Sequence, residues 1–326
     1  MVAAAITNNL GVTASLRVME AVYESDGGMT KDLKKLLVYT LVFISIFANS
    51  HALAAENEQA RSQLLSFFKS SVYTQTVNDK NIVFRWSADR ILCTYGDPSP
   101  ADLDTLVKFT YAINKLTNLN IRNFFRKNVQ ACPGDTQIYF SFRKPGEQTS
   151  ERLQDEVTFV DQRSGFDSPA TISRLTSLGY YMFKLGGGHA DYIFIALPSF
   201  GEEVNLLAGG TRNELIEKSL FQMLSGIKDT SPLQKFPTSF KDPLTTLPVS
   251  LDAAFLLKAN RRQQNLCLLD IMLLYSLYKP KPKQNLVPMP MDYHLDFIRS
   301  NFNEIRRASK DIFLNPDFKE LFPKKC

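Results

Sequence analysis

The sequence predicts an α+β fold in which helices pack on one sheet and the C-terminal half is mostly helical. Strand-like segments concentrate early in the chain, helix-like segments concentrate late, and only two crossover helices have capping signals. Nothing repeats at a fixed period, which excludes solenoids and propellers. The 326 residues, 44% of them hydrophobic, are enough for a buried core, and no linker-like composition divides residues 56–326. We therefore expect a single α+β domain over that range.

The first part of this domain is predicted to contain short strands around one well-marked helix. Ser99-Pro100-Ala101-Asp102 supplies an N-cap hydroxyl, a proline at the first helical position and a carboxylate one turn in, so a helix begins there. Short β-branched or aromatic runs predict strands, and an amphipathic pattern predicts a helix before them. These segments are a helix at 57–72 and strands at 81–86, 90–95 and 136–142.

A polar stretch and a hairpin are expected next. Residues 144–168 are polar and charged, which is typical of an exposed excursion with one short helix. Apolar strands at 180–185 and 192–197 are joined by a turn that contains three glycines and His189. A phosphate-binding loop would need a helix directly after the glycines, whereas a strand follows, so the pattern favours a hairpin.

The rest of the chain is predicted to be mainly helical. A capping box at Thr211–Glu214 and a C-terminal glycine frame a helix over 212–225. Four prolines between residues 229 and 250 predict a long loop. Residues 266–278 are apolar almost all round, which is typical of a central buried helix, and residues 291–322 predict two short helices with polar faces.

Residues 29–55 have the features of a secretory signal. A basic segment that starts at Met29 is followed by an apolar run and by small residues that fit the cleavage rule. The apolar run is shorter than the ~20 residues that cross a bilayer, so we expect cleavage near Ala54 or Ala55 and no transmembrane segment afterwards. Residues 1–28 precede this better start and are interpreted as an over-extended leader. The mature protein is expected to be periplasmic or secreted.

All four cysteines lie in the expected mature part, and an oxidising compartment permits disulfides. Four cysteines allow three pairings, and the sequence alone leaves all three open. We favour Cys93 with Cys132 because both flank predicted strands, while Cys267 lies in an apolar helix and Cys326 is the last residue. No Cys-x-x-Cys pair is present, which argues against a thioredoxin-like motif or a zinc ribbon.

The formal net charge is only +5, far from the concentrated basic stripe of a nucleic-acid-binding protein. We expect no nucleic-acid partner and no cofactor, and we expect a protein or envelope component as the partner. The run Lys279-Pro280-Lys281-Pro282-Lys283 could touch an acidic envelope surface. We favour an extended solvated linker, because that is the commoner role of such runs.

Several short motifs follow one another in a defined order between residues 80 and 285. They are Val83–Trp86, Tyr95–Asp97, Ile216–Leu224, Asp229, Ser239–Asp242 and Asp270–Pro280. Their order and spacing resemble the proteobacterial domain-of-unknown-function family DUF2927, whose members are predicted secreted proteins and lipoproteins. The resemblance implies an exported protein.

Members of that family often carry a His-Glu or Glu-Glu pair before a glutamine, which implies a distant likeness to zinc metallopeptidases. The matching positions here are Glu217 and Lys218. A zincin needs two histidines one helical turn apart, and positions 217 and 221 are Glu and Phe. The remaining candidates for a metal site are Glu217 and His189, and the candidate catalytic residues are Glu217, Gln222, Asp242 and Asp270.

Each candidate also has a structural interpretation. Glu217 and Gln222 are five residues apart and do not share a helix face, and Glu217 is expected to be a solvated carboxylate near a helix N-terminus. Asp242 and Asp270 lie at the edges of apolar elements, where a carboxylate usually caps backbone amides. A buried catalytic role for either aspartate is the alternative.

The leading hypothesis is therefore an exported bacterial envelope protein that binds a partner and is either non-catalytic or a degenerate enzyme. A metallopeptidase-like hydrolase is one alternative, and an effector exported to act on another cell is the second. The sequence leaves open the ligand, the disulfide pairing and the oligomeric state.

Overall fold

In the computed structural model the chain divides into two units, Met1–Gln63 and Leu64–Cys326. The sheet lies in the second unit. The structure describes Thr40 and residues 55–72, 74–77, 79–83, 85–86, 89–143, 150–163, 180–186, 189–198, 212–225, 266–281 and 289–322. Apart from Thr40 and Ala55, the expected signal segment lies outside the described residues, and so does the predicted loop at 229–250.

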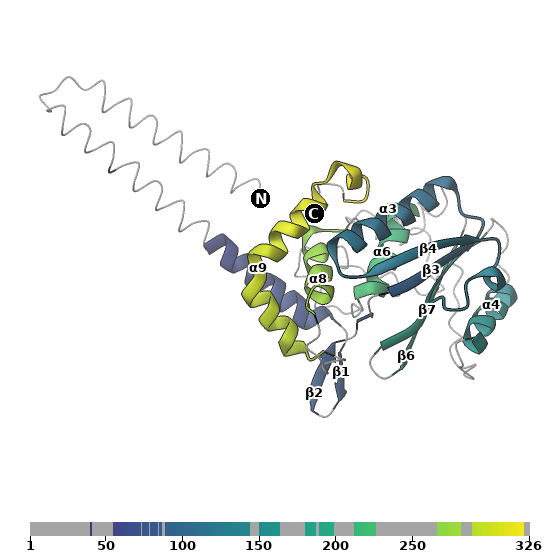
Figure 1. Ribbon diagram of the computed structural model, residues 1–326, viewed down its shortest axis with the longest axis horizontal. Helices are drawn as coiled ribbons and strands as arrows, with labels where there is room; N and C mark the ends of the chain where they lie inside the picture. The colour runs from purple at the N-terminus through teal and green to yellow at the C-terminus, as the bar shows by residue number, and fades with distance from the viewer. Residues whose placement is uncertain are drawn as a thin grey trace, which may run out of the picture. The chain divides into compact units, whose positions relative to one another are not determined.

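The centre of the second unit is a five-stranded sheet (Figure 1). Its strands are parallel except for the last, which joins its neighbour as an antiparallel hairpin. The predicted α+β fold and the predicted hairpin are confirmed. The strand order is β4 (Asn120–Arg126), β3 (Asp89–Gly96), β5 (Ile138–Arg143), β7 (His189–Pro198) and β6 (Tyr180–Gly186).

A small two-stranded sheet precedes the main one in the chain. The residues 55–71 are helical, and β1 (Thr74–Val77) then pairs antiparallel with β2 (Lys80–Val83). Asp79, in the turn between the two strands, has a φ of 59°. The strand predicted at 81–86 corresponds to β2, which begins one residue earlier, at Lys80, and ends at Val83.

The strands β3 and β4 differ in burial because they occupy different places in the sheet. Residues Ile91–Tyr95 of β3 are buried without a break, as expected for a strand covered on both faces. In β4, Ile121 is buried while Arg122, Phe125 and Arg126 are exposed. The strand β4 is the edge of the sheet, and the sequence did not predict it because its polar and charged residues hide the alternation.

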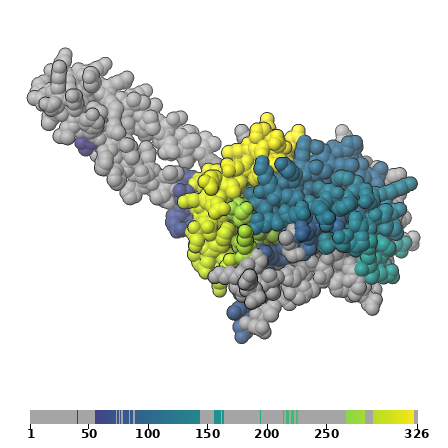
Figure 2. Space-filling model, in the orientation of Figure 1, coloured from purple at the N-terminus to yellow at the C-terminus, as the bar shows by residue number. Residues whose placement is uncertain are grey.

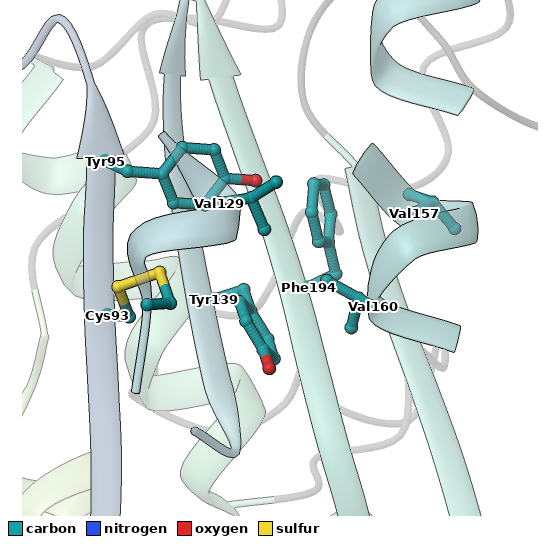
Figure 3. Packing of buried hydrophobic residues seen from close by; sticks show 8 residues of the cluster. Cys93, Tyr95, Val129, Tyr139, Val157, Val160 and Phe194 are labelled. Atoms are coloured by element: carbon teal, nitrogen blue, oxygen red, sulfur yellow. A yellow bond between two sulfur atoms is a disulfide. The ribbon is translucent and has the colours of Figure 1, made fainter. Parts of the chain in front are cut away.

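Helices cover the two faces of the sheet. The helix α3 (Pro100–Leu116) begins with the predicted capping box between Ser99 and Asp102 and contacts β4. The helix α4 (Ser150–Arg163) packs against the other face, where Val157 and Val160 join a buried cluster with residues of β3, β5 and β7 (Figure 3). The helix predicted within 144–168 is therefore present, but the burial of Val157 and Val160 corrects the expectation that this segment is an exposed excursion.

The remaining helices pack beside α3. The helix α6 (Arg212–Ser225) contacts α3 and α8 (Leu268–Tyr278), and α8 contacts α9 (Met291–Phe313). Every residue of α8 after the first is buried, which confirms the predicted central helix. The two helices predicted over 291–322 correspond to the two parts of α9, which meet at the non-helical residue Asn301, and a short 3₁₀ helix, η6 (Pro316–Phe318), follows.

Candidate functional site

Motif segments that lie far apart in the sequence meet at the C-terminal end of α8. The guanidinium Nη1 of Arg85 donates hydrogen bonds to the carbonyls of Leu277, at 3.3 Å, and Pro280, at 3.1 Å. The backbone N–H of Trp86 donates to the hydroxyl of Tyr278 at 3.3 Å, and that hydroxyl donates to the carbonyl of Leu224. Residues from three of the motifs therefore form one hydrogen-bonded cluster, which we call the α8 hub.

The side chains of the α8 hub cap the C-terminal end of α8 and connect it to two other segments of the chain. The last carbonyls of a helix have no partner within the helix, and Arg85 donates to one of them, that of Leu277, and to the carbonyl of Pro280 just beyond the helix. Burial raises the pKa of the Tyr278 hydroxyl and lowers the pKa of Arg85. The phenol therefore stays protonated at neutral pH and can donate to Leu224 while it accepts from Trp86.

The other end of α8 is capped by a predicted site residue. Asp270 is fully buried, and its Oδ2 accepts a hydrogen bond of 2.8 Å from the backbone N–H of Cys267. An acidic side chain in the first turn satisfies free amides and interacts favourably with the positive end of the helix dipole. The capping interpretation of Asp270 is thus confirmed. Asp242 lies outside the described residues.

Glu217 is buried in α6, with 2% of its surface exposed. The interpretation of Glu217 as a solvated carboxylate is therefore wrong. The helix turns this residue toward the interior together with Leu220, Phe221 and Leu224. Glu217 is the sixth of the fourteen residues of α6, one turn farther from the helix N-terminus than the sequence analysis expected, and the tertiary packing that covers this turn has no local sequence signal.

The candidate metal residues can be placed only in part. His189 is the first residue of β7 and pairs with Gly186 across the hairpin, and its side chain lies outside the described residues, as does that of Gln222. Within the described residues, no group of three or more histidine, cysteine, aspartate or glutamate side chains is arranged to hold a metal ion.

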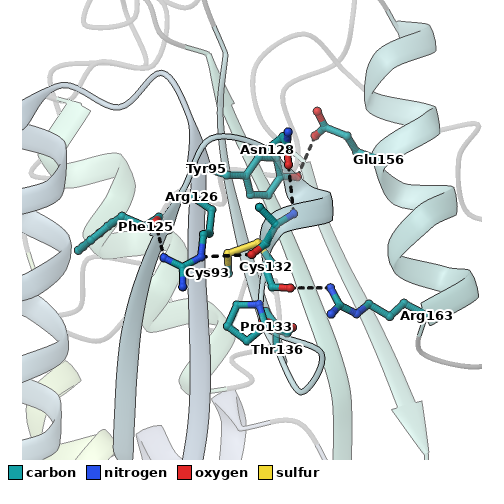
Figure 4. The surroundings of a disulfide bond; sticks show 11 residues. Cys93, Tyr95, Phe125, Arg126, Asn128, Cys132, Pro133, Thr136, Glu156 and Arg163 are labelled. Atoms are coloured by element: carbon teal, nitrogen blue, oxygen red, sulfur yellow. Dashed lines mark hydrogen bonds between the residues drawn. A yellow bond between two sulfur atoms is a disulfide. The ribbon is translucent and has the colours of Figure 1, made fainter.

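A second polar cluster, which the sequence did not reveal, lies at the carboxyl edge of the sheet. The hydroxyl of Tyr95 donates a 2.8 Å hydrogen bond to Oε2 of Glu156 (Figure 4). The hydroxyl of Ser141 donates to the same oxygen at 3.3 Å. Tyr95 and Ser141 are register partners in β3 and β5, and Glu156 reaches them from α4. In parallel sheets this edge, next to the point where connections reverse direction, is where ligands usually bind.

The geometry of this carboxyl-edge cluster anchors α4 to the sheet. Glu156 is only 6% exposed, and two hydroxyl groups supply hydrogen bonds to one of its carboxylate oxygens. A buried carboxylate needs such donors to offset the loss of water. Glu156 was missed because its partners are 15 and 61 residues away in the sequence, so no local pattern marks it.

Beside this cluster, Cys93 of β3 forms a disulfide with Cys132, which follows the short 3₁₀ helix η1 (Val129–Ala131). The preferred pairing is confirmed. The carbonyl of Cys132 accepts a 2.9 Å hydrogen bond from Nη1 of Arg163, so α4 is tied to the same loop (Figure 4). Cys267 is also disulfide-bonded, and its partner lies outside the described residues.

No family model, curated protein or solved structure matches the chain. In the part of the chain that the structure describes, none of the helices combines the length and apolar character needed to cross a membrane.

Proposed function

We propose that the chain is an exported bacterial protein of the cell envelope that acts by binding a protein or envelope partner. On this proposal the segment before Ala54 or Ala55 is a cleaved signal, and the mature protein works in the periplasm or outside the cell. We also propose that the chain is a distant member of the domain-of-unknown-function family that its motifs resemble. The disulfide between Cys93 and Cys132 is the observation that carries the proposal.

That disulfide supports export because of where it lies. Cys93 and Cys132 are 0% and 3% exposed, and they belong to the buried cluster between the sheet and α4 (Figure 3). Structural disulfides persist in oxidising compartments and are rare where glutathione and thioredoxin keep thiols reduced. A disulfide within the core is therefore consistent with folding after export.

The roles of the motif residues support binding over catalysis. Arg85 and Asp270 cap the two ends of α8, and Tyr278 joins three segments of the chain. Catalytic side chains usually face a reacting group in a cleft. Here the polar atoms of these three residues face backbone groups of the fold. A structural role therefore explains why these residues occur in the motifs that resemble the family.

The test is to express the full chain in a Gram-negative bacterium and to analyse the protein released by osmotic shock. We expect its N-terminus at residue 55 or 56, and we expect all four cysteines to resist a thiol-alkylating reagent until the protein is reduced. Recovery of uncleaved chain with alkylated cysteines in the cytoplasm would contradict the proposal. An Ala54→Arg/Ala55→Arg double variant serves as the control, because a large side chain directly before either expected cut blocks signal cleavage.

The burial of Glu217 favours one second candidate, a metallopeptidase-like hydrolase. A carboxylate that is 2% exposed is held away from bulk water, as metal ligands and general bases often are. The test compares the wild type with Glu217→Ala and His189→Ala. Stoichiometric zinc and peptide hydrolysis that both variants lose would establish the hydrolase, and unchanged metal content and hydrolysis in both would exclude it.

A further inference from the structure

The strand β4 offers an open edge at its centre. Its neighbour on one side is β3, and no strand lies on the other side in the described sheet. The side chain of Asn114 in α3 closes the start of this edge: its Oδ1 accepts from the N–H of Ile121 at 2.8 Å, and its Nδ2 donates to the carbonyl of Ile121 at 3.0 Å. The backbone groups of Ile121 therefore point away from β3.

Because alternate residues of a strand turn their backbone groups to opposite sides, Asn123 and Phe125 also point theirs outward. The carbonyl of Phe125 accepts a 2.9 Å hydrogen bond from Nη1 of Arg126, an exposed side chain (Figure 4). Among the described residues, the Asn114 amide thus closes the edge at Ile121 and the Arg126 side chain covers it at Phe125, while no hydrogen bond is made to the outward backbone groups of Asn123 between them.

The α3 side of this edge is apolar. Of the four exposed large apolar side chains among the described residues, three lie on α3 and β4: Tyr111 at 58%, Val107 at 43% and Phe125 at 38% exposure. Nδ2 of Asn123 donates to Oγ1 of Thr110. One helical turn advances about 5.4 Å and two strand residues about 6.6 Å, so the turn with Val107 comes near the level of Phe125. Figure 2 shows the blue surface of α3 and β4 uncovered.

The opposite side of the edge is basic. Arg122 and Arg126 alternate with Asn123 and Phe125 along β4, so their side chains lie on the other face of the strand. Both arginines are exposed, Lys127 follows them, and β4 contains no acidic residue. The guanidinium of Arg126 lies over the ring of Phe124, 5.5 Å from its centre, which confirms that this pair shares a face.

We propose that the β4 edge around Asn123 and Phe125 binds an extended segment of a partner protein in which apolar and acidic residues alternate. The segment adds a strand beside β4, its apolar side chains contact Val107 and Phe125, and its acidic side chains pair with Arg122 and Arg126. Main-chain hydrogen bonds supply affinity in this mode and alternate side chains supply specificity. The inference rests on the proposed function, a binding protein, and names the chemistry of its partner.

The charge of the edge selects this occupant over a second copy of the chain. Two β4 edges paired with each other would bring the arginines of both copies together, and like charges directly opposite one another destabilise a strand pair. An acidic segment instead gains attraction at each arginine and would displace Arg126 from the carbonyl of Phe125.

The experiment selects displayed random peptides of roughly ten residues on the purified, oxidised full chain. We expect the recovered peptides to alternate acidic and apolar residues. Affinity for a recovered peptide, measured by fluorescence anisotropy, should fall about tenfold in Arg122→Glu because attraction becomes repulsion. The matched control, Lys80→Glu, changes an exposed lysine of β2 by the same charge and should leave the affinity unchanged.

A second pair of variants tests whether the peptide adds as a strand. Phe125→Ala removes the ring and keeps the outward N–H, while Phe125→Pro removes both. Proline is tolerated where a strand N–H faces solvent, so the ladder with β3 should survive, and thermal unfolding checks that it does. We expect Phe125→Pro to bind about fivefold more weakly than Phe125→Ala, because the peptide loses a main-chain hydrogen bond.

Three results would overturn the inference. These are recovered peptides without the alternation, recovered peptides whose affinity is the same for Arg122→Glu, and the recovery of no peptide, with or without Arg122-dependent binding of a single-stranded oligonucleotide. These results are distinguishable from a failure of the proposed function, which is detected by the absence of signal cleavage and of cysteine oxidation. An exported, oxidised chain that recovers no such peptide refutes the β4 edge alone, and a chain that binds such a peptide but is not exported refutes only the export proposal.

Discussion

The backbone N–H of Trp86 donates a 3.3 Å hydrogen bond to the hydroxyl of Tyr278, which in turn donates to the carbonyl of Leu224. In Tyr278→Phe both backbone groups stay buried and lose this partner. We expect the free energy of unfolding to fall by about 2 kcal/mol, since an unsatisfied buried polar group costs its desolvation. Urea unfolding at fixed pH measures the change.

The matched control for that prediction is Tyr293→Phe. The hydroxyl of Tyr293 donates to the exposed Lys281 carbonyl at 3.0 Å, where water can replace it. We expect this variant to lose less than about 0.5 kcal/mol. Equal losses in the two variants would mean that the α8 hub does not hold the fold.

Gly96, the last residue of β3, is predicted to tolerate no side chain. Its φ is +94°, and a Cβ at this position would lie 2.0 Å from the carbonyl oxygen of Phe142 in β5. The oxygen belongs to the backbone, so relief requires the two strands to separate. We expect Gly96→Ala to lower the free energy of unfolding by about 3 kcal/mol or more, measured by urea unfolding.

Gly134→Ala is the control for the Gly96 prediction. The nearest atom to a Cβ at Gly134 is Nη2 of Arg163, at 3.3 Å, which is the far end of a flexible side chain. This variant should change stability by less than about 1 kcal/mol. A comparable loss at both glycines would contradict the steric argument.

The elements with strong local signals were predictable from the sequence. The capping box of Ser99 and Asp102 marks the start of α3, and the apolar run of α8 marks a buried helix. The strand β4 gave no such signal, because it packs one face on α3 and leaves Arg122 and Arg126 exposed on the other. The segment is a strand because its backbone pairs with β3, and that pairing joins residues about 30 positions apart in the sequence.

The candidate site was predictable to a smaller extent. The cap formed by Asp270 depends on a backbone amide three residues away, so sequence spacing was sufficient to predict it. The partners of Glu156 and the burial of Glu217 depend on segments that come together only in the folded chain. For these residues the missing information is tertiary packing.

Removing the disulfide between Cys93 and Cys132 is predicted to destabilise the protein strongly. The bond joins residues 39 positions apart, and in the chain-entropy model a loop of that length contributes about 4 kcal/mol by restricting the unfolded state. We expect the Cys93→Ala/Cys132→Ala double variant to lose about that much in urea unfolding. A Cys93→Ala/Cys132→Ala variant as stable as the wild type would contradict this prediction, and reduction of the wild type is no substitute because Cys267 is also disulfide-bonded.

His294 is predicted to make stability depend on pH. The residue is fully buried in α9, its Nδ1–H donates to the carbonyl of Ser276 at 3.0 Å, and its ring stacks on Phe68 with centroids 5.4 Å apart. Its Nε2 has no hydrogen-bond partner among the described residues. Burial lowers the pKa of His294 to about 4, from an ordinary value near 6.5, because a buried cation loses its water.

A histidine with a lowered folded-state pKa takes up its proton mainly on unfolding. The stabilisation is therefore complete above about pH 6.5 and is lost as the pH falls toward 4. Between about pH 7.5 and pH 5 we expect the wild type to lose roughly 2 kcal/mol in urea unfolding. His294→Gln keeps a hydrogen-bond donor but cannot titrate, so its stability should change little over this interval. His51→Gln and His189→Gln measure the contributions of the other two histidines, and an equal pH slope in His294→Gln and the wild type would show that His294 is not the titrating group.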